Sequence, residues 1–268
     1  MPGTTEARRF SHATELAEYR VYRQGDEPRR IDWRVLARTD RAFIRLGFDQ
    51  TAARTLLVVD ASASMAYPPE TLEKWHFARR LSLGLASAAL AAGDAVGLLV
   101  AGGAAPIHLP ARSRHGTLQA ITTALRAAEP RGADTMSSTL MAAPPADRVV
   151  VVSDFLEETD PTSSLVRQLA ARGCDACGVH VIHESELAPH AGDRRLIDPE
   201  DPTNGSLRRV LSASRLDAYV AAFHAWRDEV ASRWRSAGGF FVHAETSEPV
   251  AHAVYRIVGE SRSSPVVA

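Results

Sequence analysis

Runs of apolar residues recur along the chain, and the first of them is the clearest. Five apolar or β-branched residues, 55–59, follow one another without alternation and stop at Asp60. Such a run is typical of a strand covered on both faces, as in a parallel sheet flanked by helices. We therefore predict a strand over 54–60. Similar runs predict three further buried strands: 95–101, 148–154 and 176–182.

Stretches with a helical period separate these strands. The first begins near Leu72 and is expected to stop at Gly93. Further helices are expected over 116–128, 137–142, 165–172, 216–237 and 250–258, and shorter strands over 42–48, 107–109 and 240–243. Alternating strands and helices predict an α/β fold, with a doubly wound, mostly parallel sheet and helices on both faces. Residues 188–214, rich in turn residues, are expected to form an ordered loop or small insertion.

Side chains that carry oxygen lie at the ends of the predicted strands and in the loops between them. They fall into three groups: Asp60, Ser62 and Ser64; then Asp134 and Thr135; then Asp154. Ligands of open α/β sheets bind outside the carboxyl ends of the strands, so these side chains are expected to gather at one edge. Carboxylate and hydroxyl oxygens are the ligands that Mg²⁺ prefers, with Mn²⁺ or Ca²⁺ as alternatives. The sequence therefore predicts a metal site at this edge.

Composition narrows the class of protein. The 268 residues are 45% hydrophobic with a formal net charge of −1, which provides no global attraction to nucleic acid or anionic membranes. All basic residues are arginine except Lys74. No apolar stretch reaches the ~20 uninterrupted residues of a membrane span, and the start lacks the apolar segment of a secretory signal, so we expect a cytoplasmic protein. Cys174 and Cys177 lead into a predicted strand, which favours a structural role over a redox pair.

Residues 20–45 carry eight arginines against four acids. One interpretation is a basic surface that grips phosphates. The other is a structural clasp, in which the arginines pair with Asp26, Glu27 and Asp32 and pack along Trp33. The interleaved acids cancel half of the positive charge, and no known nucleic-acid motif accompanies the segment. We therefore favour the clasp and expect no nucleic-acid partner.

The pattern Asp60-x-Ser62-x-Ser64, followed by a Gly-x-x-Thr-like loop and the strand-terminal Asp154, resembles the metal-ion-dependent adhesion site of von Willebrand factor A-like domains. Those domains are doubly wound α/β folds with Mg²⁺ at the top of the sheet. Their ion leaves one coordination position open for an acidic residue of a partner. The resemblance implies that this chain holds a client's carboxylate through a bound metal.

A longer set of motifs resembles domain-of-unknown-function family fifty-eight. These motifs are Tyr22-Arg23-x-Gly25-Asp26-x-Pro28-Arg29-x-Ile31-Asp32-Trp33, Ala37-Arg38-Thr39, Phe77-Ala78-Arg79-Arg80, Gly93-Asp94-Ala95-Val96-Gly97-Leu98 and Val152-Ser153-Asp154-Phe155-Leu156. The resemblance covers roughly residues 10–160 and implies two parts. A family-specific N-terminal segment, 1–50, would pack on a von Willebrand factor A-like domain, 51–268.

Members of this family are commonly encoded beside MoxR-type AAA+ ATPases. They are thought to act with them as adaptors in assembling, activating or metallating other complexes, including bacterial methanol dehydrogenase. The resemblance therefore implies a MoxR-type ATPase as a partner. The N-terminal residues expected to contact a partner are Arg23, Asp26, Arg29, Arg30, Asp32 and Trp33.

One loop departs from the family pattern. The family usually has Gly-Gly-Thr-Asp where this chain has Gly132-Ala133-Asp134-Thr135. If Asp134 takes the threonine position, the site gains a negative charge and depends less on an external acid. If Thr135 takes it after a one-residue shift, the usual site is kept. We favour Thr135 slightly.

The expected function is a non-enzymatic, metal-dependent interaction module. One alternative is a metal-dependent hydrolase or phosphotransferase that uses Asp60 as a nucleophile. Phosphatases of that kind carry a second acid two residues on, where this chain has Ser62, and the chain holds no Gly-x-Ser-x-Gly elbow. His180 and His183 lie three apart on a predicted strand and are poor joint metal ligands. The chain also lacks a phosphate-binding P-loop, so ATPase activity would have to come from a partner.

Overall fold

The computed structural model of the chain describes residues 18–23, 31–46, 52–103, 106–131, 136–141, 143–156, 159–189, 192–196, 207–211 and 213–261. The chain divides into two units between Thr51 and Ala52, and each is described by itself. Asp26, Arg29 and Arg30, together with Asp134 and Thr135, lie outside the described residues. The roles expected of those five residues therefore stay predictions, as does the packing of the N-terminal segment on the rest of the chain.

The N-terminal unit holds two paired antiparallel strands and one helix: β1 (Glu18–Val21), α1 (Trp33–Thr39) and β2 (Phe43–Leu46). Asp32 caps the helix. Its Oδ1 accepts hydrogen bonds from the backbone N–H groups of Arg34 and Val35 at 2.9 and 3.2 Å, the arrangement favoured at helix starts. The side chain of Trp33 is 62% exposed. Asp32 thus shapes the helix, while the indole ring remains available to solvent.

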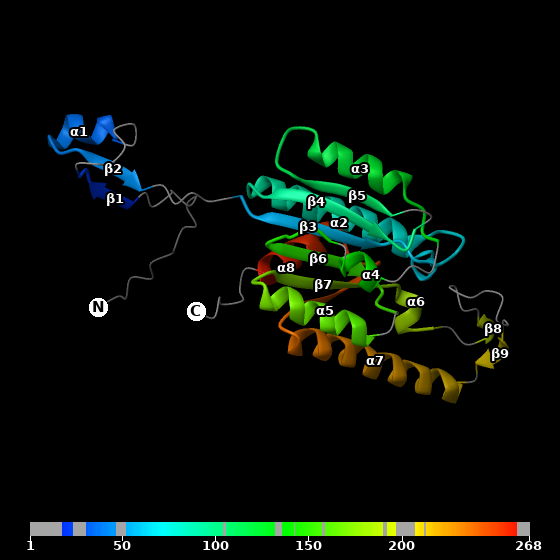
Figure 1. Cartoon of the computed structure of the whole chain (residues 1–268). Helices are drawn as coiled ribbons and strands as arrows, with labels where there is room; N and C mark the ends of the chain where they lie inside the picture. The colour runs from blue at the N-terminus through cyan, green and yellow to red at the C-terminus, as the bar shows by residue number, and fades with distance from the viewer. Residues whose placement is uncertain are drawn as a thin grey trace, which may run out of the picture. The chain divides into compact units, whose positions relative to one another are not determined.

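One six-stranded sheet organises the larger unit (Figure 1). Its strands are β3 (Arg54–Asp60), β4 (Ala95–Ala101), β5 (Ile107–Arg112), β6 (Arg148–Ser153), β7 (Asp175–Ile182) and β10 (Phe240–Glu245). Their order across the sheet is β10-β7-β6-β3-β4-β5, and every neighbouring pair is parallel except β4 with β5. Val59 of β3 lies opposite Val152 of β6. The residues that follow these two strands therefore meet at one edge of the sheet.

Helices cover both faces of this sheet (Figure 1). One face packs against α2 (Glu73–Ala91), α3 (Thr117–Ala127) and α8 (Val250–Ser261); the other packs against α4 (Met136–Met141), α5 (Thr159–Ala171) and α7 (Ala213–Ser236). In the part of the chain that the structure describes, no helix is both long and apolar enough to cross a membrane. This layered arrangement confirms the expected α/β fold.

Strand β3 lies at the centre of the core. Leu57 and Val59 pack with the helices of the first face, whereas Leu56 and Val58 pack with those of the second. Successive side chains of a strand point to opposite faces, so a strand buried on both sides needs an apolar residue at every position. Full burial of each side chain contributes about 1.5–3 kcal/mol. The unalternated run in the sequence is explained by this position.

One expectation needs correction. The helix expected over 165–172 begins at Thr159, through Pro161; proline is tolerated in a first turn, where its missing N–H would have no helical partner. Residues 188–214, expected as an ordered loop or small insertion, contain a regular antiparallel pair: β8 (Gly192–Leu196) with β9 (Leu207–Leu211). Paired arginines interrupt the apolar pattern of both strands, which is why the sequence did not predict them.

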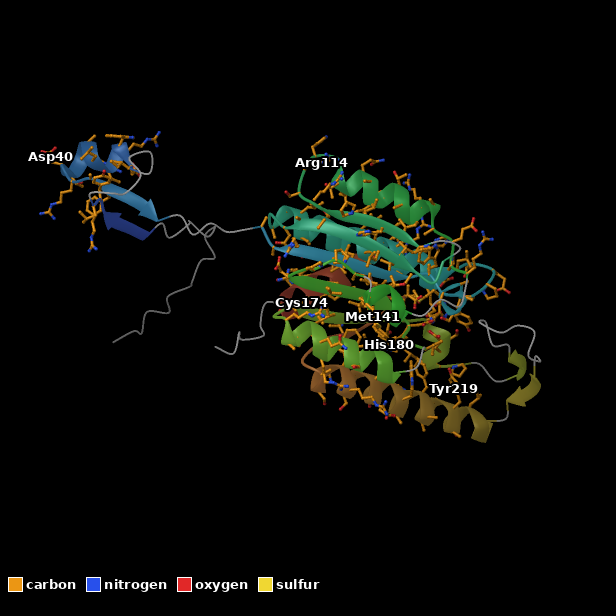
Figure 2. All side chains as sticks on the ribbon, in the orientation of Figure 1. Asp40, Arg114, Met141, Cys174, His180 and Tyr219 are labelled. Carbon is orange, nitrogen blue, oxygen red and sulfur yellow. The ribbon has the colours of Figure 1, made fainter. Side chains whose placement is uncertain are left out.

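The two cysteines are buried on opposite faces of the sheet. Cys177 packs with the α2 side and Cys174 with the α5 and α7 side. Burial raises the pKa of Cys174 to about 11, with the charge of Asp175 adding to the effect. The thiol therefore stays protonated at neutral pH, which agrees with a structural role. Figure 2 labels Cys174, which directly precedes β7.

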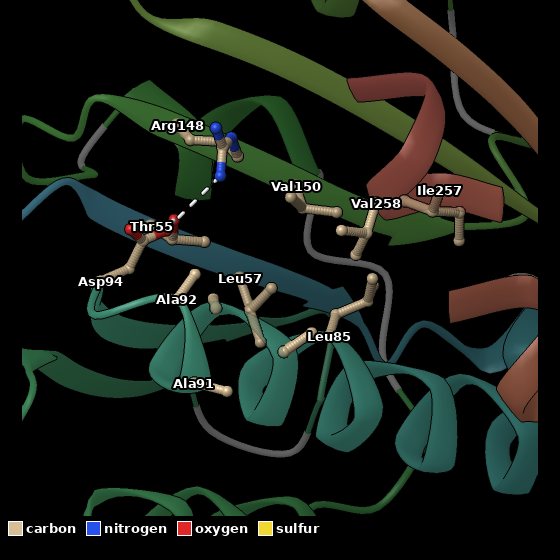
Figure 3. A pocket seen from close by; sticks show the side chains of 12 residues that line it. Thr55, Leu57, Leu85, Ala91, Ala92, Asp94, Arg148, Val150, Ile257 and Val258 are labelled. Atoms are coloured by element: carbon tan, nitrogen blue, oxygen red, sulfur yellow. Dashed lines mark hydrogen bonds and ion pairs between the residues drawn. The ribbon is translucent and has the colours of Figure 1, made fainter. Parts of the chain in front are cut away.

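A cavity of about 320 Å³ opens at the amino ends of β3 and β6, between α2 and α8 (Figure 3). Alanine and aliphatic side chains form most of its wall. Asp94 accepts hydrogen bonds there from Thr55 Oγ1 at 2.8 Å and from Arg148 Nη1 at 3.4 Å. Thr55 and Arg148 lie at the amino ends of strands whose other ends carry Asp60 and Ser153. The cavity and the expected oxygen donors therefore lie at opposite edges of the sheet.

Two histidines contact each other on the α7 side of the sheet. His180 of β7, labelled in Figure 2, is 1% exposed, and its Nδ1 lies 3.2 Å from Nδ1 of His243 on β10. Aromatic rings surround His180: Phe155, Trp226 and Phe241. Burial, with the charge of His243 second, holds the pKa of His180 well below its usual range. Burial and the charge of Arg227 lower the pKa of His243 to about 4.

We expect this pair to make the protein sensitive to acid. An unfolded histidine titrates near 6.5, so between pH 6.5 and 4 the unfolded chain binds more protons than the folded protein. The free energy of unfolding therefore decreases as the pH is lowered through this range. His243→Gln should reduce that fall by on the order of 1 kcal/mol, a value discounted for partial solvent exposure. Urea denaturation at pH 7.5 and 4.5 measures the difference.

His108→Gln is the matched control, because His108 is an exposed histidine of the edge strand β5. It should keep the wild-type dependence on pH. If His243→Gln and His108→Gln lose stability equally on acidification, the histidine pair is not the cause.

Candidate metal centre at the carboxyl edge of the sheet

The loop after β3 brings three predicted donors together. Asp60 ends the strand and is 3% exposed. Its Oδ1 accepts a hydrogen bond from the backbone N–H of Ser62 at 2.8 Å, a turn that aspartate favours. The chain then enters a short 3₁₀ turn, Ala63–Met65, and the hydroxyl oxygens of Ser62 and Ser64 lie 3.0 Å apart. The expected grouping of these three side chains is therefore present.

The end of β6 completes a crowded acidic pair. Ser153 donates its hydroxyl to Oδ2 of Asp60 at 2.5 Å, and Asp154 follows directly. Both aspartates are buried, at 3% and 2% exposure. Burial, and next the negative charge of Asp154, raise the pKa of Asp60 to about 7. Two carboxylates out of water and close together are destabilised by each other, and a cation between them would relieve this repulsion.

Gly102 lets the end of β4 approach this loop. Its φ is +71°, and a Cβ built there would lie 2.7 Å from the backbone N and 3.0 Å from the Cα of Ser62. Backbone atoms cannot move aside as the end of a long side chain can. The donor loop therefore keeps its position only because this residue has no side chain.

Lys74 is the cation that the structure places against Asp154. Its Nζ donates to Asp154 Oδ2 at 2.8 Å and to Glu186 Oε1 at 3.0 Å, and its side chain is 1% exposed. Burial favours the neutral amine, but the charges of Asp154 and Glu186 outweigh it and raise the pKa of Lys74. The ammonium is therefore charged, and Asp154 is partly neutralised.

A hydrogen-bonded corner beside Lys74 joins α2 to the short helix α6 (Glu184–Leu187). His183 caps α6, and its Nε2 lies 3.1 Å from Glu73 Oε2. Its Nδ1 lies 2.8 Å from the hydroxyl of Ser185, which in turn lies 2.8 Å from the hydroxyl of Tyr67. His180 and His183 thus make separate contacts, which agrees with the expectation that they do not share a metal.

The donor set fits a hard divalent cation. The side chains of Asp60, Ser62, Ser64 and Asp154 all offer oxygen, and Gly102 provides the close approach that groups three of them in one loop. Within the described part of the chain, no three His, Cys, Asp or Glu side chains gather as a cluster. A cation here would therefore rely on the hydroxyls of Ser62 and Ser64 as well as on the two aspartates.

Sequence reasoning located the donors but missed their supports. Ser153, Lys74 and Glu186 were not among the expected site residues, although they contact Asp60 or Asp154, directly or through Lys74. One signal was available: Lys74 is the single lysine of a chain that otherwise uses arginine. No local signal marks Glu186, which lies 112 residues from Lys74 along the chain.

Comparison with known proteins places these residues in a family. Residues 18–228 match the family model described as Protein of unknown function DUF58. Uncharacterized protein Rv1480 of Mycobacterium tuberculosis H37Rv is 30% identical over 258 residues, which cover 93% of this chain and 80% of that protein. Uncharacterized protein Mb1516 of Mycobacterium bovis matches with the same values.

Solved structures share the fold at low sequence identity. An aerotolerance-related membrane protein from Bacteroides fragilis aligns with a TM-score of 0.51 and 14% identity, over 80% of this chain and 100% of that chain. The conserved hypothetical protein BatB from Bacteroides thetaiotaomicron has a TM-score of 0.48 and 14% identity, with the same coverage. Likeness at this identity concerns the fold alone. The doubly wound α/β fold expected from the sequence is confirmed.

We predict that Gly102→Ala destabilises the protein more than Gly93→Ala. Both glycines have positive φ, so both variants lose about 1 kcal/mol through backbone strain. Only at Gly102 would the new methyl group also meet the backbone of Ser62; at Gly93 nothing lies within 4 Å. The additional loss should be roughly 1–3 kcal/mol, as for other overpacked sites.

Urea denaturation of the two variants at one pH measures this difference. Equal losses would mean that the loop moves aside freely, and that Gly102 does not position it.

Proposed function

The chain belongs to the DUF58 family, and from this membership we propose that it is a non-enzymatic, metal-dependent protein-interaction module. Family and fold together support an interaction module in general terms. The observation that carries the metal dependence is the buried, oxygen-only cluster at the carboxyl edge. Its members come from two neighbouring strand ends: Asp60, Ser62, Ser64 and Asp154.

The proposed ion is Mg²⁺, with Mn²⁺ or Ca²⁺ as alternatives. Asp60 and Asp154 would supply negative charge, and Ser62 and Ser64 would supply neutral oxygen. When bound, an ion with so few anionic ligands keeps the capacity to attract one more carboxylate from outside. Asp134 or Thr135 would complete the donor set, and the choice between them stays open.

The proposed ligand of the loaded site is an acidic residue of a client protein. A MoxR-type AAA+ ATPase is the second partner, as the family resemblance implies. We assign its contact to the N-terminal segment, where the indole of Trp33 is 62% exposed. The residues proposed for this contact are Arg23, Asp26, Arg29, Arg30, Asp32 and Trp33.

The geometry gives little support to the enzyme alternative. A nucleophilic Asp60 would need a general acid beside it, yet the residue two positions on is Ser62, and Asp154 is paired with Lys74. The hydroxyl of Ser62 lies against that of Ser64 rather than against a base. These contacts are more compatible with a site that binds a ligand than with a site that attacks a substrate.

We expect the protein to bind one Mn²⁺ or Mg²⁺, and Asp60→Ala and Asp154→Ala to abolish that binding because each removes a charged ligand. Isothermal titration measures it. Asp94→Asn is the matched control, since Asp94 is an equally hydrogen-bonded aspartate at the opposite edge of the sheet; it should bind as the wild type does. Equal binding by the wild type and an Asp60→Ala/Asp154→Ala double variant would show that these aspartates do not form a metal centre.

We also expect a purified MoxR-type ATPase to bind this protein through the N-terminal segment. Trp33→Ala should weaken the complex at least tenfold while leaving Mn²⁺ affinity unchanged, because Trp33 lies in the other unit from the metal centre. Tyr255→Ala, which removes another exposed ring, is the control. Surface-immobilised ATPase reports the affinities; a complex unaffected by Trp33→Ala would remove that segment from the interface.

A further inference from the structure

Lys74 is an unusual residue in this chain. It is the only lysine among 268 residues, and its side chain is 1% exposed. A charged ammonium is costly to bury unless carboxylates compensate it. Here two carboxylates do so, and one of them, Asp154, belongs to the candidate metal centre.

Backbone hydrogen bonds fix both the main chain of Lys74 and the carboxylate of Glu186 that pairs with it. The backbone N–H of Lys74 donates to the carbonyl of Tyr67 at 2.9 Å. On the other side, Glu186 Oε2 accepts from the backbone N–H of His183 at 2.7 Å while Oε1 accepts from Lys74. The carboxylate of Glu186 is thus directed at Lys74 by its own helix cap. The ammonium is built into the site rather than placed there by a mobile side chain.

We propose that Lys74 is a resident counter-charge that weakens cation binding at the metal centre and strengthens the hold of the loaded centre on a partner's carboxylate. The inference rests on the proposed function and goes beyond it, because it makes the partner's acid part of what retains the ion.

The arrangement of charges explains why Lys74 would weaken cation binding. A cation held by Asp154 would share that carboxylate with Lys74, and Glu186 would act on the cation across the ammonium. Repulsion falls with distance, so Glu186 only partly offsets Lys74. Asp154 also has Oδ2 engaged by Lys74, and the other oxygen, Oδ1, accepts from the backbone N–H of Leu156 at 3.4 Å. The ion competes for a carboxylate that is already paired.

The same charges explain why Lys74 would strengthen the hold on a partner's carboxylate. In the loaded centre, with Asp60, Asp154 and Glu186 all ionised, Lys74 reduces their three negative charges to a net two, which a divalent ion would neutralise. Without Lys74 the loaded cluster would keep one negative charge and repel an incoming acid. A partner's carboxylate therefore meets a neutral centre in this protein and an anionic one in its absence.

A purely structural ion pair predicts the opposite result for the ion. If Lys74 only positioned Asp154, its removal would misplace a ligand and weaken metal binding. The direction of the change therefore separates the two roles.

The experiment titrates the full chain with Mn²⁺ and follows free Mn²⁺ by electron paramagnetic resonance. Lys74→Gln is expected to bind Mn²⁺ at least tenfold more tightly than the wild type. Glu186→Gln should bind it at least threefold more weakly, because the ammonium then lies against Asp154 alone. Unchanged or reversed effects overturn the inference. If Lys74→Gln does not fold, Lys74→Gln/Glu186→Gln keeps the net charge and is expected to exceed the wild-type affinity.

A second measurement uses acetate as the carboxylate. Acetate added to the Mn²⁺-loaded protein displaces bound water, which water-proton relaxation reports. The wild type is expected to bind acetate at least threefold more tightly than Lys74→Gln; equal or weaker binding overturns the second half of the inference. A wild type without Mn²⁺ affinity overturns the metal centre as a whole, whereas a wild type that binds while Lys74→Gln binds no more tightly overturns the role of Lys74 alone.

Thr55→Val controls for general loosening of the sheet. It removes a buried hydrogen bond at the opposite edge and is expected to keep wild-type Mn²⁺ affinity. A gain in affinity equal to that of Lys74→Gln would attribute the effect to loosening and overturn the inference.

Discussion

The close approach of two buried carboxylates, Asp60 and Asp154, is the constraint around which the carboxyl edge of the sheet is built. Each is taken out of water by the sheet and its helices, and the negative charge of Asp154 adds to the cost of ionising Asp60. Neighbouring residues partly compensate this cost. Ser153 and the backbone of Ser62 donate hydrogen bonds to Asp60, and Lys74 neutralises part of Asp154. An added divalent cation would continue the same compensation.

The fold explains why this cost arises at one edge only. Strands β3 and β6 are parallel neighbours, so the residues after Val59 and Val152 emerge side by side. At the amino ends of the same strands the charges are already balanced, because Asp94 is paired with Arg148 beside an alanine-lined cavity. The buried acidic pair of Asp60 and Asp154 therefore lies at the carboxyl edge, which is also where α/β sheets commonly bind ligands.

This distribution of charge connects stability with the proposed function. Buried ion pairs contribute little net stability, since desolvation offsets their attraction. The Asp154–Lys74–Glu186 chain is thus poorly explained as a device for stability alone. It is better explained as a way to hold two acids ready at a binding site, with a resident positive charge that sets how strongly the site attracts an ion and how strongly the loaded site attracts an acid.

The sequence by itself determined the features that depend on local pattern. The run of apolar residues before Asp60 predicted a strand buried on both faces, and the helical periods predicted the covering layers. Asp60-x-Ser62-x-Ser64 with Asp154 indicated candidate donors, and the longer motifs, above all those over residues 22–33, indicated the family. Tertiary structure alone decided which distant groups meet those donors. Glu186 reaches Lys74 across 112 residues, and Gly102 approaches Ser62 from a neighbouring strand. Such contacts follow from how strands and helices pack, so no local spacing encodes them; the arginine-interrupted pair β8 and β9 escaped prediction because local pattern was the only guide there.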